Sequence, residues 1–365
     1  FLTPQNRMPF FGGTYFPAHA SGALPGFADV LQQLRAYFGS GRETIASQNQ
    51  FLLSQFDVLA APLPECGPPS RDAIVDARRL LEASFDATNG GFGSAPKEPP
   101  VLAINHLFRQ WEASQHADTP DLKALYMAAL TLTRMAESGL NDMVAGGFFS
   151  HCIDATWSVP NFDKPLGING LLVECYAQAA VATGEDLFAH TAKSIANWLL
   201  ETMVSADGSF LGGMTPDPAL RPENVYLWTF ATLHDVLSDT EFRALRSRVG
   251  LGDSEQERIA PLHLQARHPW NKVAEELGIS ITEAKSEFGR GLSKLRNIRS
   301  RRPGILVDER SRILYNAFAI RGLAVSGRVL GSKNYIDAAR IAFAHACDRL
   351  DKNQQCVVRS EEHTS

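Results

Sequence analysis

The sequence predicts a mainly α-helical protein of repeated helical hairpins, and three observations support this fold class. An acidic turn that ends in glycine and phenylalanine occurs three times, as Asp86-Ala-Thr-Asn-Gly-Gly-Phe92, Asp142-Met-Val-Ala-Gly-Gly-Phe148 and Asp207-Gly-Ser-Phe210. The glycines at 90, 146 and 208 lie about 56 and 62 residues apart, which suits one helical hairpin plus a loop. Segments with the helical spacing of apolar side chains occupy most of the chain between the turns.

The first part of the chain predicts a strand end, a turn-rich segment and two helices. Residues 1–4 are typical of the last residues of a strand, and residues 7–17 are rich in glycine and aromatic side chains. One helix is expected at 27–38, where apolar side chains share one face, and a second at 42–59. Residues 60–70 hold four prolines and predict a linker between domains.

Helix follows helix beyond the linker. The helical period predicts helices near 70–85, 100–115, 120–139, 162–183, 186–204, 229–249, 270–302, 311–330 and 333–351. Short strand-like pieces at 147–153, 209–214 and 225–228 are expected to form small hairpins on one rim. The arginine-rich run 290–302 follows several glutamates, so it is interpreted as a solvated helix face, with a patch for phosphate or nucleic acid as the alternative.

Composition sets limits on the class of protein. The chain has 365 residues, 44% hydrophobic content and a formal net charge of -5, which indicates one large domain plus a smaller one and no basic excess for nucleic acid or membranes. No apolar run reaches the roughly 18 residues of a membrane span. The cysteines form no C-x-x-C pair, which predicts a reducing, cytoplasmic location without a zinc ribbon or disulfide framework: Cys66, Cys152, Cys175, Cys347 and Cys356.

Both ends of the sequence suggest a fragment. The chain starts at Phe1 without a methionine, and residues 359–365 look like a translated sequencing adapter. We therefore expect the natural protein to extend beyond both ends.

Several blocks of sequence together resemble one known family. They are residues 1–4 with 10–17, then 85–97, 146–164, 225–229 and 322–335. In this order they resemble the thioredoxin-domain-containing proteins related to spermatogenesis-associated protein 20. The resemblance implies the C-terminal part of an α/β thioredoxin-like domain over 1–59, then an incomplete (α/α) six-hairpin toroid over 71–358 of the kind shared with glycosidases and N-acylglucosamine epimerases. The C-x-x-C segment of the family would lie upstream of Phe1.

The implied toroid directs attention to polar residues in the loops on its rim. Sugar chemistry needs a proton donor and a base, and aromatic rings supply flat apolar surfaces. The candidate catalytic residues are Asp163, Asp217, Glu223 and His151. The candidate substrate-binding residues are Asp154, Trp157, Asn161, Asn169, Trp228 and Asn316.

Several candidates also have a structural interpretation, and Asp217 and Glu223 could simply be exposed charges of a loop. Asp163 is expected in the first turn of a helix, where it would offset the helix dipole. Trp157 suits packing as well as a sugar platform, and His151 suits an internal hydrogen bond. The chain also departs from the family at Asn161, Gly167 and Ile168, where the family has histidine, tyrosine and aspartate, and this weakens acid–base catalysis as a hypothesis.

Three hypotheses of function follow. The first is binding or processing of a carbohydrate by carboxylate chemistry at the toroid. The second is a thiol-redox or partner-binding protein whose toroid is a non-catalytic scaffold. The third and weakest is a sugar epimerase that would pair His151 with His263 or His268. No cofactor or metal motif is expected, since the segment 90–93 lacks the context of a phosphate-binding loop, and Cys152 is interpreted as a small buried thiol.

Overall fold

A computed structural model describes residues 1–4, 6–20, 24–60, 71–220, 223–252, 254 and 260–348. The chain divides into two compact units, Phe1–Ala73 and Ile74–Ser365. Outside the described residues lie 61–70 of the predicted linker, the tail 359–365, and the cysteines at 66 and 356.

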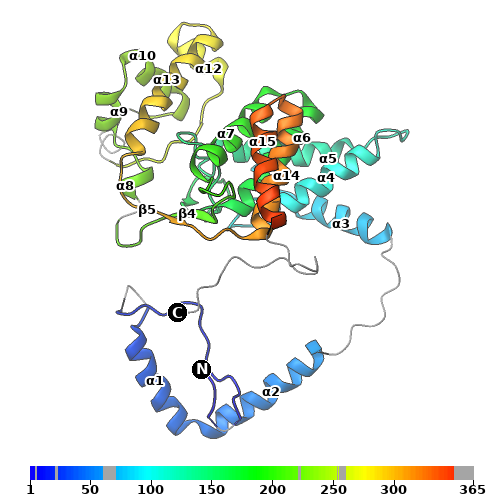
Figure 1. The fold of residues 1–365 in the computed structure, drawn as a ribbon, viewed down its shortest axis with the longest axis vertical. Coiled ribbons are helices and arrows are strands. Elements are labelled where there is room, and N and C mark those ends of the chain that lie inside the picture. Colours follow the sequence, from blue (N-terminus) through cyan, green and yellow to red (C-terminus); the bar gives the residue numbers. More distant parts are fainter. Residues whose placement is uncertain are drawn as a thin grey trace. The chain divides into compact units, whose positions relative to one another are not determined.

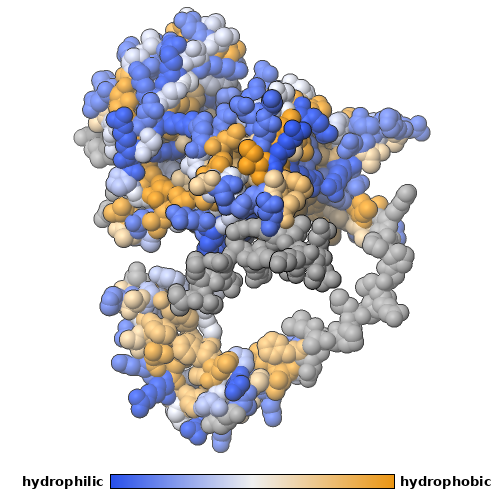
Figure 2. Space-filling model, in the orientation of Figure 1, coloured by the Kyte–Doolittle hydropathy of each residue, from blue (hydrophilic) through white to orange (hydrophobic). Residues whose placement is uncertain are grey.

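The first unit contains both helices that the sequence predicts, α1 (Phe27–Ser40) and α2 (Arg42–Ala60). A single antiparallel bridge joins Leu2 to Pro9. Val30 and Leu34 of α1 and Ile45 of α2 are buried, but large apolar side chains of both helices remain exposed and appear orange in Figure 2.

The second unit is mainly helical (Figure 1), and the contacts of its helices divide most of them into two rows. One row contains α4 (Val101–Ala113), α6 (Leu166–Thr183) and α14 (Ile313–Leu330), with α6 packed between the other two. The second row contains α5 (Leu122–Glu137), α7 (Asp186–Thr202) and α15 (Lys333–Asp348), and each of these contacts the helix that precedes it in the chain. This alternation of inner and outer helices is that of an incomplete (α/α) toroid, so the predicted mainly α fold is confirmed.

α3 (Arg71–Ser84) extends the outer row beside α5. Its Arg78 donates two hydrogen bonds, of 2.8 and 2.9 Å, to the carboxylate of Asp121, which also caps the first turn of α5. Aspartate is a favoured N-cap because its oxygens accept the N–H groups that the first helical turn leaves unpaired. The contact therefore fixes α3 against the start of α5.

The inner helices α6 and α14 pack closely because glycine lies at their crossing. A Cβ atom at Gly322 would stand 2.2 Å from the carbonyl oxygen of Gly170. In the described part of the chain, α14 alone is long and apolar enough to cross a membrane by length and composition, although the sequence pattern predicted no such segment. Its contacts with α6 and α15 account for its apolar side chains in a packed helical layer.

A group of helices is inserted between α7 and α14. It consists of α8 (Glu223–Tyr226), α9 (Phe230–Val236), α10 (Asp239–Val249), α12 (Trp270–Leu277) and α13 (Ile281–Arg299). α9, α10, α12 and α13 share a second hydrophobic core that includes Leu233, Leu245 and Leu295, whereas Val225 and Tyr226 of α8 belong to the core of the toroid helices. The single predicted helices at 229–249 and 270–302 are each wrong as continuous helices, because Ser238 and Ser280 cap new helices within them.

Short strands line the loops before the inner helices. β1 (His151–Cys152) pairs with β2 (Pro160–Asn161), and β4 (Gly213–Pro216) lies between β3 (Lys164–Pro165) and β5 (Ile305–Asp308), all antiparallel. The strand predicted at 147–153 is present in shortened form as β1, in a hairpin with β2. The piece predicted at 209–214 overlaps β4, but it forms no hairpin, because β4 pairs with β3 and β5, which lie far away in the chain. The strand predicted at 225–228 is wrong at its start, since residues up to Tyr226 form α8, but Trp228 forms an antiparallel bridge with Leu262.

Candidate functional site

The first two glycine–phenylalanine turns have the same internal construction. In the first turn, residues 86–92, Lys97 donates to the carboxylate of Asp86 at 2.6 Å and to the carbonyl of Gly90 at 2.8 Å. In the second turn, residues 142–148, Lys164 donates to Asp142 at 2.9 Å and to the carbonyl of Gly146. A buried lysine thus binds the first and fifth residues of each turn.

Both turns also pack against the next outer helix and beneath a tryptophan. Gly90 and Gly146 have φ values of 69° and 83°, in the left-handed region that favours glycine. The lysine Nζ lies 5.5 Å from the ring centre of Trp157 in the first turn and 4.6 Å from that of Trp198 in the second. These cation–π contacts support the buried ammonium groups.

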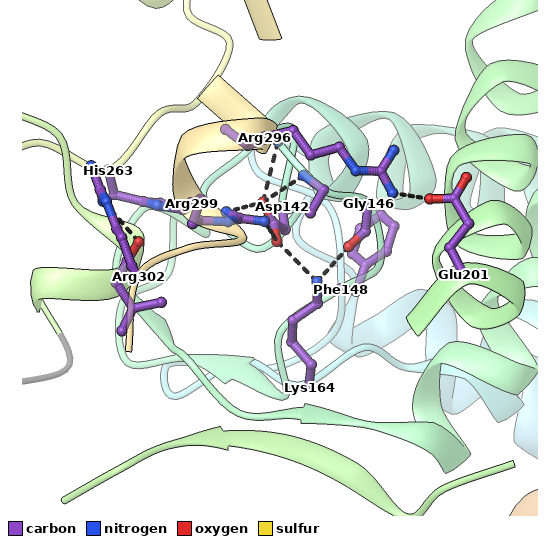
Figure 3. Close-up of polar contacts among 12 residues, drawn as sticks. Asp142, Gly146, Phe148, Lys164, Glu201, His263, Arg296, Arg299 and Arg302 are labelled. Atoms are coloured by element: carbon purple, nitrogen blue, oxygen red, sulfur yellow. Dashed lines mark hydrogen bonds and ion pairs between the residues drawn. The ribbon is translucent and has the colours of Figure 1, made fainter. Parts of the chain in front are cut away.

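The second turn differs by one additional cation. Arg299, the last residue of α13, donates two hydrogen bonds to Asp142, at 2.8 and 2.6 Å (Figure 3). The side chains of Asp142, Lys164 and Arg299 are 1%, 3% and 9% exposed. The sequence interpretation of run 290–302 as a solvated face is therefore wrong at its C-terminal end, where tertiary packing turns Arg299 inward.

Burial and charge shift the pKa values of this group. Burial raises the pKa of Asp142, but Arg299 and Lys164 lower it far more, so the carboxylate is held well below its usual pKa. Burial lowers the pKa of Lys164 to about 8; Asp142 opposes this change, and Arg299 adds to it. Two cations therefore share one ionised carboxylate in a desolvated place.

A pocket of about 440 Å³ lies beside these three residues. Its other walls come from α7, α8, β4, β5 and the segment after α13, and include Trp198, Tyr226, Ser300, Arg302 and Ile305. Arg296 and Val307 at the pocket are 39% and 40% exposed, which gives the pocket a solvent-facing side. We call this cavity the second-turn pocket.

Two further arginines line the pocket, Arg296 in α13 and Arg302 just after the end of that helix. Arg296 pairs with Glu201 of α7, and Arg302 donates to the carbonyl groups of Val225 and Leu227, each at 2.9 Å. Burial first, and then the charge of Arg299, lower the pKa of Arg302. The second-turn pocket is thus cationic on one wall and aromatic on another.

The polar residues predicted in the second loop mainly hold that loop together. His151 and Asn161 face each other across β1 and β2, and the Asn161 side chain accepts from the N–H of Asp163 at 3.1 Å. The carboxylate of Asp154 accepts from the N–H groups of Thr156, Ser158 and Val159. None of these three predicted residues lines the second-turn pocket.

The predicted acids are dispersed over the rim. Asp163 lies between β2 and β3 and accepts from the hydroxyl of Thr215. Its predicted place in a first helical turn is wrong, because α6 begins only at Leu166. Asp217 accepts from the N–H of Ala219 at 2.9 Å, and Glu223 begins α8 with a side chain outside the described part of the structure. Catalytic roles for these acids stay predictions.

Asn169 and Asn316 occupy matching places in the fourth position of α6 and α14. The Asn169 amide accepts from the N–H of Phe148 at 2.7 Å and donates to its carbonyl at 2.9 Å. The Asn316 amide makes the same two bonds, at the same distances, with Phe210. Both side chains are buried, so each amide fixes a turn phenylalanine to an inner helix, and their predicted contact with substrate stays untested.

The predicted tryptophans are both 1% exposed. The Trp157 indole donates to the carbonyl of Asn89 at 3.0 Å and covers the first turn, in agreement with the packing interpretation. Trp228 stacks with Arg302, whose guanidinium carbon lies 3.9 Å from the ring centre. Trp228 therefore orients an arginine of the pocket wall.

The histidines proposed for an epimerase each bind a different local group. The His151 ring lies 3.0 Å from the Ser150 hydroxyl, and the His263 ring lies 2.8 Å from the carbonyl of Gly139. The His268 ring lies 2.8 Å from the carbonyl of Ser247 in the inserted helices. The described part of the chain contains no group of three or more His, Cys, Asp or Glu side chains suited to a metal ion.

Cys152 and Cys175 are buried thiols, as the sequence suggested for Cys152. Burial raises the pKa of Cys152 to about 12, and nearby Asp154 adds to this shift. A thiol needs its ionised form to act as a nucleophile, so this environment disfavours that role.

Sequence reasoning missed the residues that define the pocket. Asp142 and Lys164 belong to the sequence blocks named above but have no predicted role, and Arg299 falls within the run that the sequence predicts to be a solvated face. A local signal existed, since Asp86 and Asp142 hold the same place in Asp-x-x-x-Gly-Gly-Phe and a lysine follows each turn.

Comparison with known proteins supports the resemblance drawn from the sequence. Residues 1–57 match the family model Thioredox_DsbH, a protein of unknown function, DUF255. Over 371 residues the chain is 29% identical to spermatogenesis-associated protein 20 of Homo sapiens, and the match covers 93% of this chain and 46% of that protein. The Mus musculus protein of the same name is 28% identical over 368 residues. The chain thus spans about half the length of these relatives.

Solved structures with partial similarity were also found. A sugar epimerase from a ruminal bacterium aligns with a TM-score of 0.32 at 13% identity, covering 77% of this chain and 88% of that one. A family 76 glycoside hydrolase from a bovine Bacteroides thetaiotaomicron strain aligns with a TM-score of 0.30 at 12% identity, covering 67% and 46%.

Proposed function

We propose that the helical unit is a binding domain for a carbohydrate or a similar polar small molecule, and that the second-turn pocket is its site. The observation that carries this proposal is a cavity of about 440 Å³ in which aromatic and polar side chains converge. Small-molecule sites commonly have volumes of about 300–1,000 Å³ and combine apolar walls with a few polar groups. Tyr226 and Trp198 supply apolar surface, and Ser300 and Lys164 supply hydrogen-bonding groups.

The same geometry favours binding over hydrolysis. Glycoside hydrolysis uses two carboxyl groups beside the scissile bond, one of which must be protonated. Among the described residues that line the pocket, Asp142 is the carboxylate, and two cations hold it ionised. A carboxylate with a strongly depressed pKa is a poor general acid.

A pair of neighbouring substitutions in β5 tests the site. Ile305 lines the pocket, whereas the next residue, Leu306, is absent from its lining and is 46% exposed. Ile305→Trp should fill the cavity and abolish the thermal stabilisation that millimolar monosaccharides give to the unaltered chain. Leu306→Trp is the matched control and should keep this stabilisation. Absence of stabilisation by every sugar in a broad panel, neutral and charged, would contradict the proposal.

A second candidate is a thiol-redox or partner-binding protein in which the helical unit is a scaffold. The match of residues 1–57 to Thioredox_DsbH favours this alternative. A disulfide-reduction assay on this chain and on a full-length relative tests it: activity only in the longer protein would support it, and inactivity of both would contradict its redox form.

A further inference from the structure

Two buried cations share one carboxylate at the wall of the second-turn pocket. Asp142 carries one negative charge, whereas Lys164 and Arg299 carry two positive charges, and all three side chains are at most 9% exposed. Removing charges from water is costly unless they are compensated, so an excess charge in such a place favours an incoming counter-charge. The first turn shows that the scaffold itself needs only one cation, since Lys97 and Asp86 pair one to one there.

Both cations retain capacity to donate hydrogen bonds. A guanidinium has five N–H groups and an ammonium has three. In the described structure, Arg299 directs two of its donors to Asp142, and Lys164 directs one to Asp142 and one to Gly146. Both residues line the pocket, and their charge-assisted hydrogen bonds suit carboxylate or phosphate oxygens.

The nearby charges reinforce this preference. Arg296 also lines the pocket, and its partner Glu201 belongs to α7 outside the pocket lining. Figure 3 shows Arg299 and Lys164 approaching the Asp142 carboxylate from different sides, with Arg296 and Arg302 in the same region. A ligand in the pocket therefore meets several cationic side chains on the α13 side.

We infer that the second-turn pocket selects a ligand with an anionic group, a phosphate ester or a carboxylate, which Arg299 and Lys164 bind. This inference rests on the proposed function for the sugar-like part of the ligand. For the anionic group it rests on the charges alone. The class of ligand is then an acidic or phosphorylated sugar rather than a neutral one.

Isothermal titration of the full chain at pH 7 and low salt tests the inference. The probes are glucose, glucose 6-phosphate, glucuronate and inorganic phosphate. At least one of the two anionic sugars should bind ten or more times as tightly as glucose, and the ratio between them distinguishes a phosphate site from a carboxylate site.

Arg299→Gln is the decisive variant. It leaves Asp142 and Lys164 as a one-to-one pair like Asp86 and Lys97, so the chain should fold, and the preference for the anionic sugar should fall to near parity with glucose. Arg299→Lys keeps a cation and should retain part of the preference. Arg290→Gln, on the exposed side of α13, is the matched control and should leave the preference unchanged.

The outcomes separate the two proposals. Equal affinity for glucose and both anionic sugars, or an unchanged preference in folded Arg299→Gln, overturns the anionic ligand while leaving sugar binding in place. Binding of inorganic phosphate without any sugar preserves the anion site and overturns the carbohydrate. Failure of all four probes to bind overturns the anionic ligand, and the broad sugar panel then decides whether the pocket binds a carbohydrate.

Discussion

The first and second turns use the same backbone and the same Asp–Lys pair, but they differ in charge balance and in surroundings. In the first turn, one lysine meets one aspartate that is 21% exposed. In the second, Arg299 arrives from α13, 157 residues farther along the chain, and the aspartate is almost fully buried. The comparison teaches that Asp–Lys pairing builds the loop, whereas the additional arginine and the pocket are specific to the second loop.

Removing the aspartate should give the largest contrast between the turns. Asp142→Asn leaves two buried cations without their carboxylate, and breaking a buried ion pair costs about 3–5 kcal/mol. Asp86→Asn leaves only one cation, Lys97, and the carboxylate that it removes is 21% exposed, so a smaller loss of about 1–3 kcal/mol is expected. Urea unfolding of both variants measures the difference, and equal losses would contradict the distinction between the turns.

Sequence reasoning found the shared part of the turns and missed the part that differs. The positive φ values at Gly90 and Gly146 follow from local sequence, because adjacent glycines permit a conformation that other residues resist. The pairing of Asp142 with Arg299 depends on how the inserted helices pack, and no local pattern encodes a contact across 157 residues. Short-range rules also placed Asp163 in a helix, which the pairing of β3 with β4 prevents.

Alanine at the fifth residue of each turn should show how far the scaffolds are equivalent. A Cβ at Gly146 would stand 2.5 Å from the Ser194 carbonyl oxygen, and one at Gly90 would stand 2.8 Å from the Thr131 Cα. Both substitutions combine a left-handed φ with a clash against helix backbone, so each should lose about 2 kcal/mol or more.

Gly93→Ala provides the control for this pair. Gly93 also has a positive φ, of 73°, but no atom lies within 4 Å of its hypothetical Cβ. Gly93→Ala should therefore lower the free energy of unfolding by only about 1 kcal/mol, the cost of backbone strain. Chemical denaturation ranks the three variants; a Gly146→Ala protein as stable as Gly93→Ala would show that the turn does not pack on α7 as described.

Anion affinity of the second turn should depend on pH. The pKa of Lys164, near 8, lies below its usual range, so the ammonium predominates at pH 7 and is mostly neutral at pH 9. Loss of this charge leaves Arg299 and Asp142 as a one-to-one pair. Lys164 must then take up a proton when the anion binds, so the affinity falls with rising pH, by at most about tenfold per pH unit. Sulfate is a suitable titrant because its charge is constant over this range.

The pH effect has a direct control in Lys164→Met. This variant lacks the titrating group, so its weaker sulfate affinity should be constant between pH 7 and 9 by calorimetry. A wild-type affinity that stays constant over the same interval would contradict a Lys164 that both binds the anion and loses its proton below pH 9.

Removing the lysine should destabilise the first turn more than the second, whereas removing the aspartate should destabilise the second turn more. Lys164→Met leaves Asp142 with both of its bonds to Arg299, whereas Lys97→Met leaves Asp86 with only polar hydrogen-bond donors from Thr88 and Asn89. Each variant also loses one bond to a glycine carbonyl, so this contribution cancels in the comparison. Lys97→Met should therefore be the less stable by about 1 kcal/mol in urea unfolding. If Lys164→Met is the less stable, Arg299 does not compensate Asp142 by itself, and the second turn needs both cations for folding rather than for a ligand.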